Sequence, residues 1–306
     1  MKGISPGVYR RVTLAALVAL GVIVVTGAAV RLTGSGLGCP DWPNCDAGHL
    51  SPHGDTGYHG AVEFVNRTFT GLVSVLVIVA VLGSLVRRPR RADLTWLSCG
   101  LVAGVIAQIV LGGLVVIYGL SPPWVIAHFI VSMFLVADAV VLHHRAGLPD
   151  GRPTVTAVAT GVQRMGWVLV AACAAVIATG TIVTGAGPHG GDENVRRLGI
   201  AVTDAARIHG ITENAFLVAV LVTLWLLSRT GAPAQIRHNG NVLLAVLFGQ
   251  ATVGYIQYFS GVPVVLVAVH IVGAVVVWSA TLFFVLGLRV PEAEQVPERE
   301  LVELRG

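Results

Sequence analysis

The chain has 306 residues, of which 55% are hydrophobic and only 12% are charged, and its mean hydropathy is +0.79. Soluble domains carry about 25% charged residues, so this composition excludes an ordinary soluble globular protein. The formal net charge is +4, and the distribution of the basic residues indicates membrane topology and gives no signal for nucleic-acid binding.

Eight apolar runs predict an all-α polytopic membrane protein, because each run is long enough to cross a hydrocarbon core of about 30 Å. The first run follows Lys2, Arg10 and Arg11 and could pass for a signal peptide. It is too long for one, and no small-residue cleavage site follows, so we expect a retained helix. The predicted helices span residues 11–31, 58–86, 94–118, 124–143, 164–184, 204–228, 240–259 and 263–288.

The basic residues predict the orientation of these helices. With the N-terminus inside, the cytoplasmic segments carry fifteen of the 20 basic residues, and the outer segments carry only Arg31, Arg196, Arg197 and Arg207. An excess of Lys and Arg marks the cytoplasmic side. We therefore expect a multi-pass protein of a bacterial-type plasma membrane with both termini in the cytoplasm.

Two of the four cysteines, Cys39 and Cys45, lie in the first outer loop, GLGCPDWPNCDAG. This loop faces an oxidising compartment, and its Pro and Gly residues favour turns, so we expect a disulfide in preference to two free thiols. Cys99 and Cys173 lie within predicted helices, where small core residues are the better interpretation.

Three short sequence patterns in the first half of the chain recur in the second half in the same order. The first and fifth helices end in RLTGSG (31–36) and IVTGAG (182–187), and the second and sixth contain HGAVE (59–63) and HGITE (209–213). The third match has one spacing in both halves: Gln108, Gly112 and His128, then Gln250, Gly254 and His270. Such matches predict two tandem four-helix bundles related by a pseudo-two-fold axis along the membrane normal, with two similar pockets. The predicted parts are an N-terminal half (1–143), a cytoplasmic linker (144–163), a C-terminal half (164–288) and a cytoplasmic tail (289–306).

Ionisable side chains within a membrane span cost at least ~2.5 kcal/mol each and are functional candidates by default. Asp138 lies towards the inner end of its helix, where it can reach the interface, and receives little weight. The full set is His59, Glu63, Arg67, His128, Asp138, His209, Glu213 and His270.

The four histidines of this set are expected near the outer leaflet at similar depth, two in each half. Two imidazoles that face each other across a bundle suit axial ligation of a heme iron. A zinc ion would need a third or fourth ligand, which we do not find at that level. A single histidine in a membrane span more often serves as an interhelical hydrogen bonder, but four placed by a repeat favour metal binding.

Glu63 lies four residues after His59 and four before Arg67, so the three share one helix face. One interpretation is a structural ion pair between Glu63 and Arg67. The other is that Glu63 faces the first pocket as an acid, base or charge stabiliser, while Arg67 holds a heme propionate. Glu213 repeats Glu63 without a following arginine, which suggests that the two pockets have different roles.

The strings RLTGSGLGCPDWPNC (31–45) and VEFVNR (62–67), with a histidine near the start of the fourth, sixth and eighth helices, resemble the heme A synthase family. The likeness covers nearly the whole chain. That family consists of duplicated eight-helix membrane enzymes, which oxidise the C8 methyl of heme O to a formyl group and so supply heme A to terminal cytochrome oxidases. The resemblance implies that His59 and His128 hold substrate heme O, that His209 and His270 ligate heme b, and that Glu63 is the essential carboxylate. Cys39 and Cys45 match an outer-loop cysteine pair of the family.

Two departures from the family pattern are visible. Many members have a histidine immediately before the arginine of the second helix, where this chain has Asn66, and the second outer cysteine pair of some members is absent from GPHGGDENVRR (187–197). His59 precedes Asn66 by seven residues, about two turns and about 10 Å along the same helix face. Because Asn is a poor iron ligand, and because the HGxxE string aligns His59 with His209, we expect His59 to be the ligand.

The resemblance thus implies an oxidoreductase that converts heme O to heme A by successive hydroxylations. One alternative is a diheme b-type cytochrome that transfers electrons between quinone and a partner, and another is a repeat-built transporter. The expected partners are heme O, delivered by a heme O synthase, membrane lipid, cytochrome oxidase assembly factors and a second copy of the chain; no nucleic acid is expected.

Overall fold

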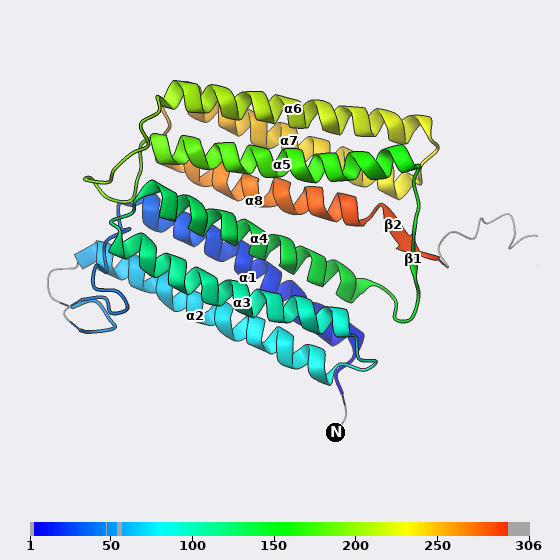
Figure 1. The fold of residues 1–306 in the computed structure, drawn as a ribbon, viewed down its shortest axis with the longest axis horizontal. Coiled ribbons are helices and arrows are strands. Elements are labelled where there is room, and N and C mark those ends of the chain that lie inside the picture. The colour runs from blue at the N-terminus through cyan, green and yellow to red at the C-terminus, as the bar shows by residue number, and fades with distance from the viewer. Residues whose placement is uncertain (1–2, 47, 54–56, 293–306) are drawn as a thin grey trace, which may run out of the picture.

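Eight long helices make up almost all of the fold (Figure 1). The computed structural model describes residues 3–46, 48–53 and 57–292. All eight helices of this part are long and apolar enough to cross a membrane, as predicted. They are α1 (Pro6–Leu32), α2 (Gly57–Val86), α3 (Ala92–Ile117), α4 (Pro122–Gly147), α5 (Thr160–Ala186), α6 (Val202–Arg229), α7 (Ala234–Phe259) and α8 (Val264–Leu286).

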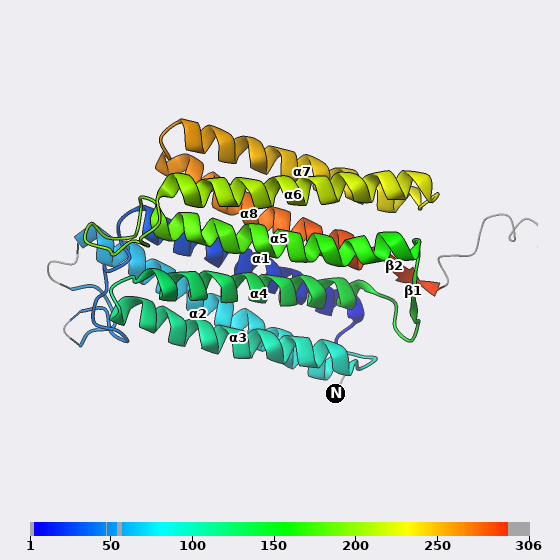
Figure 2. The same cartoon turned by 45° about the horizontal axis from the view of Figure 1, so that its top comes forward.

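The first four helices lie together, and so do the last four, with α1 and α4 next to α5 and α8 where the two groups meet (Figures 1 and 2). One buried apolar cluster crosses this junction and includes Val24 of α1, Met133 of α4 and Trp278 of α8. The indole nitrogen of Trp278 also donates to the backbone carbonyl of Met133 over 2.9 Å. The two groups therefore share part of their core.

Proline marks the start of several helices. Pro6 and Pro122 lie in the first turns of α1 and α4, and Pro233 and Pro263 immediately precede α7 and α8. Backbone N–H groups in the first turn of a helix have no partner within the helix, so proline loses no hydrogen bond there. Its fixed φ also matches the φ of a helix. Proline thus marks where these four helices begin.

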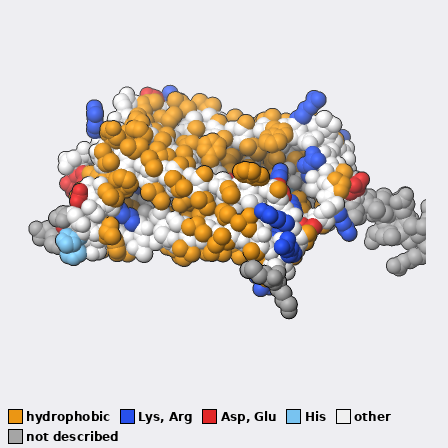
Figure 3. Space-filling view, turned by 60° about the horizontal axis from the view of Figure 1, so that its bottom comes forward, with side chains coloured by type: hydrophobic (Ala, Val, Ile, Leu, Met, Phe, Trp, Pro, Cys, Tyr) orange, Lys and Arg blue, Asp and Glu red, His pale blue; other side chains and the backbone are white. Residues whose placement is uncertain are grey.

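Hydrophobic side chains cover the middle of the face shown in Figure 3, and most of the Lys and Arg side chains on it gather towards one end. That end holds Arg10 and Arg11 of α1 together with the loops after α2, α4 and α6. An apolar belt with charge at the ends is the surface that a bilayer requires.

The stretch predicted as a linker, 144–163, contains the end of α4, a short strand and the start of α5. This strand, β1 (Thr154–Thr156), pairs antiparallel with β2 (Arg289–Pro291), which follows α8. Nearby, fully buried Arg87 pairs with Asp150 over 2.8 Å. The chain segments before and after the second group of helices are thereby joined to each other at this end.

Candidate functional site

His209 and His270 face each other between α6 and α8, with ring centroids 6.3 Å apart and ring planes at 73°. Two imidazoles on opposite sides of one metal atom, each with a metal–nitrogen bond of about 2 Å, have ring centres about 6 Å apart. The spacing of this pair therefore fits axial ligation of one iron. Among the residues that the structure describes, no group of three or more His, Cys, Asp and Glu side chains could hold a metal.

The contacts of each ring in this pair fix its orientation. The Thr179 hydroxyl lies 3.2 Å from Nδ1 of His209 and within 2.9 Å of the carbonyl of Ala175. When it donates to this carbonyl, it accepts from Nδ1 of His209. This tautomer leaves the lone pair of His209 on Nε2, the arrangement seen when a second-shell partner orients a ligating histidine. Nδ1 of His270 is buried without a hydrogen-bond partner, and such a buried polar atom calls for an explanation.

Two glycines leave room for the two rings, and a glutamine bonds to the backbone of one of the histidines. A Cβ added to Gly254 of α7 would lie 3.0 Å from Cε1 of His270, and one added to Gly180 of α5 would lie 3.1 Å from Cε1 of His209. Gln250 donates its side-chain amide to the backbone carbonyl of His270 over 2.9 Å. Side chains larger than hydrogen at these glycines would push the rings out of place.

His128 of α4 has the same surroundings as His270. Gln108 donates to the backbone carbonyl of His128 over 3.0 Å, and a Cβ on Gly112 would lie 3.5 Å from the Cε1 of the ring. Nδ1 of His128 is likewise buried without a hydrogen-bond partner. The repeated spacing of Gln, Gly and His therefore corresponds to one local arrangement that occurs twice. We noted both glutamines as repeat markers without giving them a role, and the structure supplies one.

His59 lies in the first turn of α2, as the sequence predicts, but not at the level of His209. Since α2 begins at Gly57, His59 is its third residue, and its side chain is exposed. Its Nδ1 lies 2.9 Å from Oγ of Ser35, in the loop after α1. Among the ring contacts of the described residues, none joins His59 to His128, whereas one joins His209 to His270. The expectation of four histidines at similar depth is therefore corrected for His59.

The physical reason is a difference in where the two helices begin. Since α6 begins at Val202, His209 is its eighth residue, and it contacts the interior of α5 through Thr179. The HGxxE strings of the two halves thus occupy different turns of α2 and α6, and matching His59 with His209 through them is wrong. Asn66, which lies deeper on α2, bonds through its Oδ1 with the hydroxyl of Thr26 on α1 over 2.8 Å.

Glu63 and Arg67 form the ion pair that was one of the two interpretations. Arg67 donates to Oε1 of Glu63 from Nε over 3.1 Å and from Nη2 over 2.6 Å, and the Glu63 side chain is 8% exposed. Oε2 of Glu63 accepts from the backbone N–H of Cys39 over 2.7 Å. Arg67 also donates to the carbonyls of Asn44 and Cys39 over 2.7 and 2.8 Å.

These bonds attach the loop between α1 and α2 to α2. The expected disulfide joins Cys39 to Cys45, both fully buried. Trp42 of this loop packs on Gly113 of α3, where an added Cβ would come within 2.6 Å of its ring, and Gly38 packs against the backbone carbonyl of His59. The loop therefore packs on α2 and α3, and Trp42 lies next to the glycine that faces His128.

Two other predicted residues have fewer contacts. Glu213 lies half-buried on α6, and no ion pair involves it within the described part of the chain. Asp138 points towards Gly100 on α3, where an added Cβ would come within 2.7 Å of its carboxylate. Neither residue belongs to the site formed by His209 and His270.

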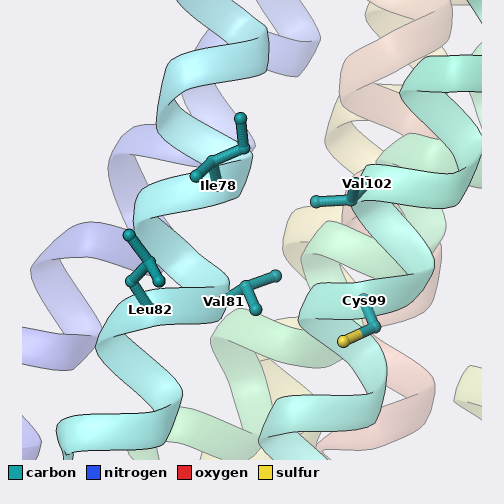
Figure 4. A pocket seen from close by; sticks show the side chains of 5 residues that line it. All are labelled: Ile78, Val81, Leu82, Cys99 and Val102. Atoms are coloured by element: carbon teal, nitrogen blue, oxygen red, sulfur yellow. The ribbon is translucent and has the colours of Figure 1, made fainter.

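An apolar groove of about 230 Å³ separates part of α2 from α3 (Figure 4). It includes none of the predicted site residues, and we assign no chemistry to it. Cys99 lines this groove and is only partly buried, so the prediction of a core residue is confirmed for Cys173 and not for Cys99. The groove is lined by Ile78, Val81, Leu82, Cys99 and Val102.

Comparison with known proteins gives a consistent set of relatives. Residues 10–187, more than half of the chain, match the family described as cytochrome oxidase assembly protein. A protein of Listeria welshimeri named heme A synthase is 32% identical over 127 residues, which are 41% of this chain and 41% of that protein. A heme A synthase of Alkalihalophilus pseudofirmus is 31% identical over 172 residues, 55% of this chain and 57% of that protein. The matched segments thus span about two fifths to just over half of the length of these curated relatives.

Proposed function

This chain belongs to the family of cytochrome oxidase assembly proteins, and we propose that it acts in heme A biosynthesis as a heme A synthase. In this proposal it oxidises the C8 methyl of heme O to a formyl group by successive hydroxylations. The supporting observation is the facing pair of His209 and His270, whose centroid distance of 6.3 Å suits one heme iron.

In this proposal His209 and His270 hold a resident b-type heme in the C-terminal half. A heme held by two imidazoles supplies one-electron redox chemistry. Thr179 orients the His209 ring through Nδ1, and Gln250 holds the backbone of His270. Gly180 and Gly254 leave the space that the two rings occupy.

The N-terminal half receives heme O as substrate, with His128 as the residue that faces its iron. Gln108 and Gly112 hold His128 as Gln250 and Gly254 hold His270. Glu63 serves the reaction as a fixed carboxylate that stabilises positive charge or takes up protons as the methyl carbon is oxidised. The disulfide loop above it limits the access of water from the outer side.

We further propose that both termini are cytoplasmic, so that the histidine pair and the disulfide loop lie towards the outer side. The end of the molecule that carries most Lys and Arg is then the inner one. Heme O delivered by a heme O synthase enters the N-terminal half, and heme A passes to cytochrome oxidase assembly.

Pigment analysis of the purified full-length protein tests this function. Extraction and mass measurement are expected to find heme B in near-stoichiometric amount with a smaller amount of heme O or heme A, and added heme O with an electron acceptor is expected to yield heme A. Heme B alone, with no conversion of heme O, would support the electron-carrying cytochrome instead. A protein free of heme would support a transporter.

A further inference from the structure

Asn66 occupies in the N-terminal half the place that His209 occupies in the C-terminal half. Thr26 of α1 bonds with Asn66 of α2 over 2.8 Å, and Thr179 of α5 bonds with His209 of α6 over 3.2 Å. Each of these threonines is followed by a glycine, Gly27 or Gly180. The same Thr-Gly pair on the first helix of each half therefore contacts Asn66 in one half and His209 in the other.

The register of the helices supports this correspondence. α2 and α6 end at Val86 and Arg229, and α3 and α7 end at Ile117 and Phe259, so equivalent residues of the two halves differ by 143 and 142 positions. Asn66 and His209 differ by 143. The buried residues of the two helices follow the same shift: Val73, Val77, Ala80 and Ser84 on α2 match Phe216, Val220, Thr223 and Leu227 on α6.

The space beside Asn66 differs from the space beside His209, in line with the sizes of the two side chains. A Cβ on Gly180 would lie 3.1 Å from the ring of His209, whereas one on Gly27 would have nothing within 4 Å outside its own stretch of helix. The asparagine side chain is shorter than histidine and does not reach over Gly27. The N-terminal half thus keeps the glycine that accommodates a ring, and has no ring there.

Asn66 cannot replace the missing imidazole as an iron ligand. Its Oδ1 accepts from the Thr26 hydroxyl, so the group left to face the site is the amide NH₂, which offers hydrogens and no lone pair for a metal. Imidazole nitrogen suits iron, while carbonyl oxygen suits harder cations such as magnesium and calcium. His59 lies two turns nearer the outer end, about 10 Å from the level of Asn66, and is held there by Ser35.

We propose that the N-terminal site binds its heme through His128 alone, with Asn66 at the place of the second axial ligand, so that one axial position of the iron stays open. This inference rests on the proposed function, in which the N-terminal heme is the substrate. A heme with two imidazole ligands is retained, whereas one with a single ligand exchanges more readily. The two halves then use one architecture for a permanent heme and for a heme that must leave.

The test adds ferric heme O to the full-length protein that already holds its resident heme, and follows the second heme by absorption and electron paramagnetic resonance. In the wild type we expect a high-spin second heme beside a low-spin resident one. Asn66→His is expected to make the second heme low-spin and to slow its capture by apomyoglobin at least about tenfold, because it adds an iron ligand. Asn66→Ala, the matched control, is expected to keep the second heme high-spin.

His59→Ala decides between this arrangement and the one expected from the sequence. A wild-type second heme that is low-spin and becomes high-spin in His59→Ala would overturn the proposal, and so would an Asn66→His protein whose second heme stays high-spin. Uptake of no second heme by any variant would also overturn it. The low-spin signal of the resident heme shows that each variant is folded; if Asn66→His fails that check, the spin state of the wild type and of His59→Ala decides.

The proposed function fails separately, because it is read from conversion of heme O to heme A. A protein that forms heme A while its second heme is low-spin through His59 refutes the single-ligand site and keeps the function. A protein whose second heme is high-spin but that never forms heme A keeps the single-ligand site and refutes the function.

Discussion

Arg67 and Glu63 form an ion pair one turn apart on α2, with 2.6 Å between Nη2 and Oε1. Glu63→Gln keeps the size of the side chain and its ability to accept from the Cys39 N–H, and removes the charge. We expect this variant to retain its C-terminal heme b and to accumulate heme O in place of heme A, measured by mass analysis of extracted pigments. Glu193→Gln, at an exposed position in the loop between α5 and α6, is the control. Near-normal heme A in Glu63→Gln would leave Glu63 with a structural role only.

Arg67 also holds the disulfide loop, through the carbonyls of Cys39 and Asn44. Hydrogen bonds to charged groups contribute about 1.5–3 kcal/mol each, so Arg67→Gln is expected to loosen the loop. A mild reductant should then open the Cys39–Cys45 bond about tenfold faster, as followed by thiol alkylation and mass measurement. Arg31→Gln removes an arginine that bonds with the carbonyls of Thr184 and Pro188 and should leave the rate unchanged. Equal rates in both variants would contradict the role given to Arg67.

Gly254 provides the space for the His270 ring, since an added Cβ would lie 3.0 Å from Cε1. Gly254→Ala is expected to displace the ring and to lower heme b occupancy by at least about half, because a packed interior resists added volume. Gly249→Ala lies on the same helix with nothing within 4 Å of the added atom, and should keep full occupancy. The heme-to-protein absorbance ratio of the two variants is the measurement, and full occupancy in Gly254→Ala would refute the steric argument.

Removing either imidazole of the C-terminal pair is expected to convert or abolish the low-spin signal of the resident heme. His209→Ala and His270→Ala are the variants, since these rings lie 6.3 Å apart on either side of the proposed iron position. His238→Ala removes an exposed histidine of α7 and should keep the spectrum. If both single variants retain an unchanged low-spin spectrum, the ligand assignment is wrong.

Trp278 joins the halves through its bond with the Met133 carbonyl. Trp278→Phe keeps most of the buried ring and loses this bond, so we expect the free energy of unfolding to fall by about 1 kcal/mol. Trp225→Phe changes a tryptophan that is 56% exposed, and should have a smaller effect. Unfolding in mixed micelles measures both, and an equal loss in the two variants would deny Trp278 a role in the junction.

The number of helices was predictable because hydrocarbon thickness fixes the length of an apolar span. Their limits were less so: α1 and α7 begin at Pro6 and Ala234, five and six residues before the predicted starts. The disulfide followed from the side of the membrane on which Cys39 and Cys45 were expected to lie. The register between the halves was not predictable from the HGxxE strings, since His59 and Asn66 differ by about two full turns and lie on one helix face. A pattern of hydrophobic positions is nearly unchanged by such a shift, so periodicity gives no warning of it.

The signal that fixes the register was present in the sequence, in the dipeptides Thr26-Gly27 and Thr179-Gly180. The dipeptides became informative only with the structure, in which each threonine bonds with a residue of the adjacent helix at the same level. The ion pair of Glu63 and Arg67 was foreseen as one of two interpretations, and the catalytic role of Glu63 remains a prediction.

The pairing of β1 with β2 has a consequence for biosynthesis. Thr154–Thr156 precede α5, whereas Arg289–Pro291 follow α8, so the first strand emerges from the ribosome long before its partner. While the four intervening helices enter the bilayer, β1 has no strand to pair with. Its pairing is a late event, which closes the second bundle only after its last helix is in place. The short ribbon can therefore form only after α8 has been synthesised, and its formation marks the completion of the second group of helices.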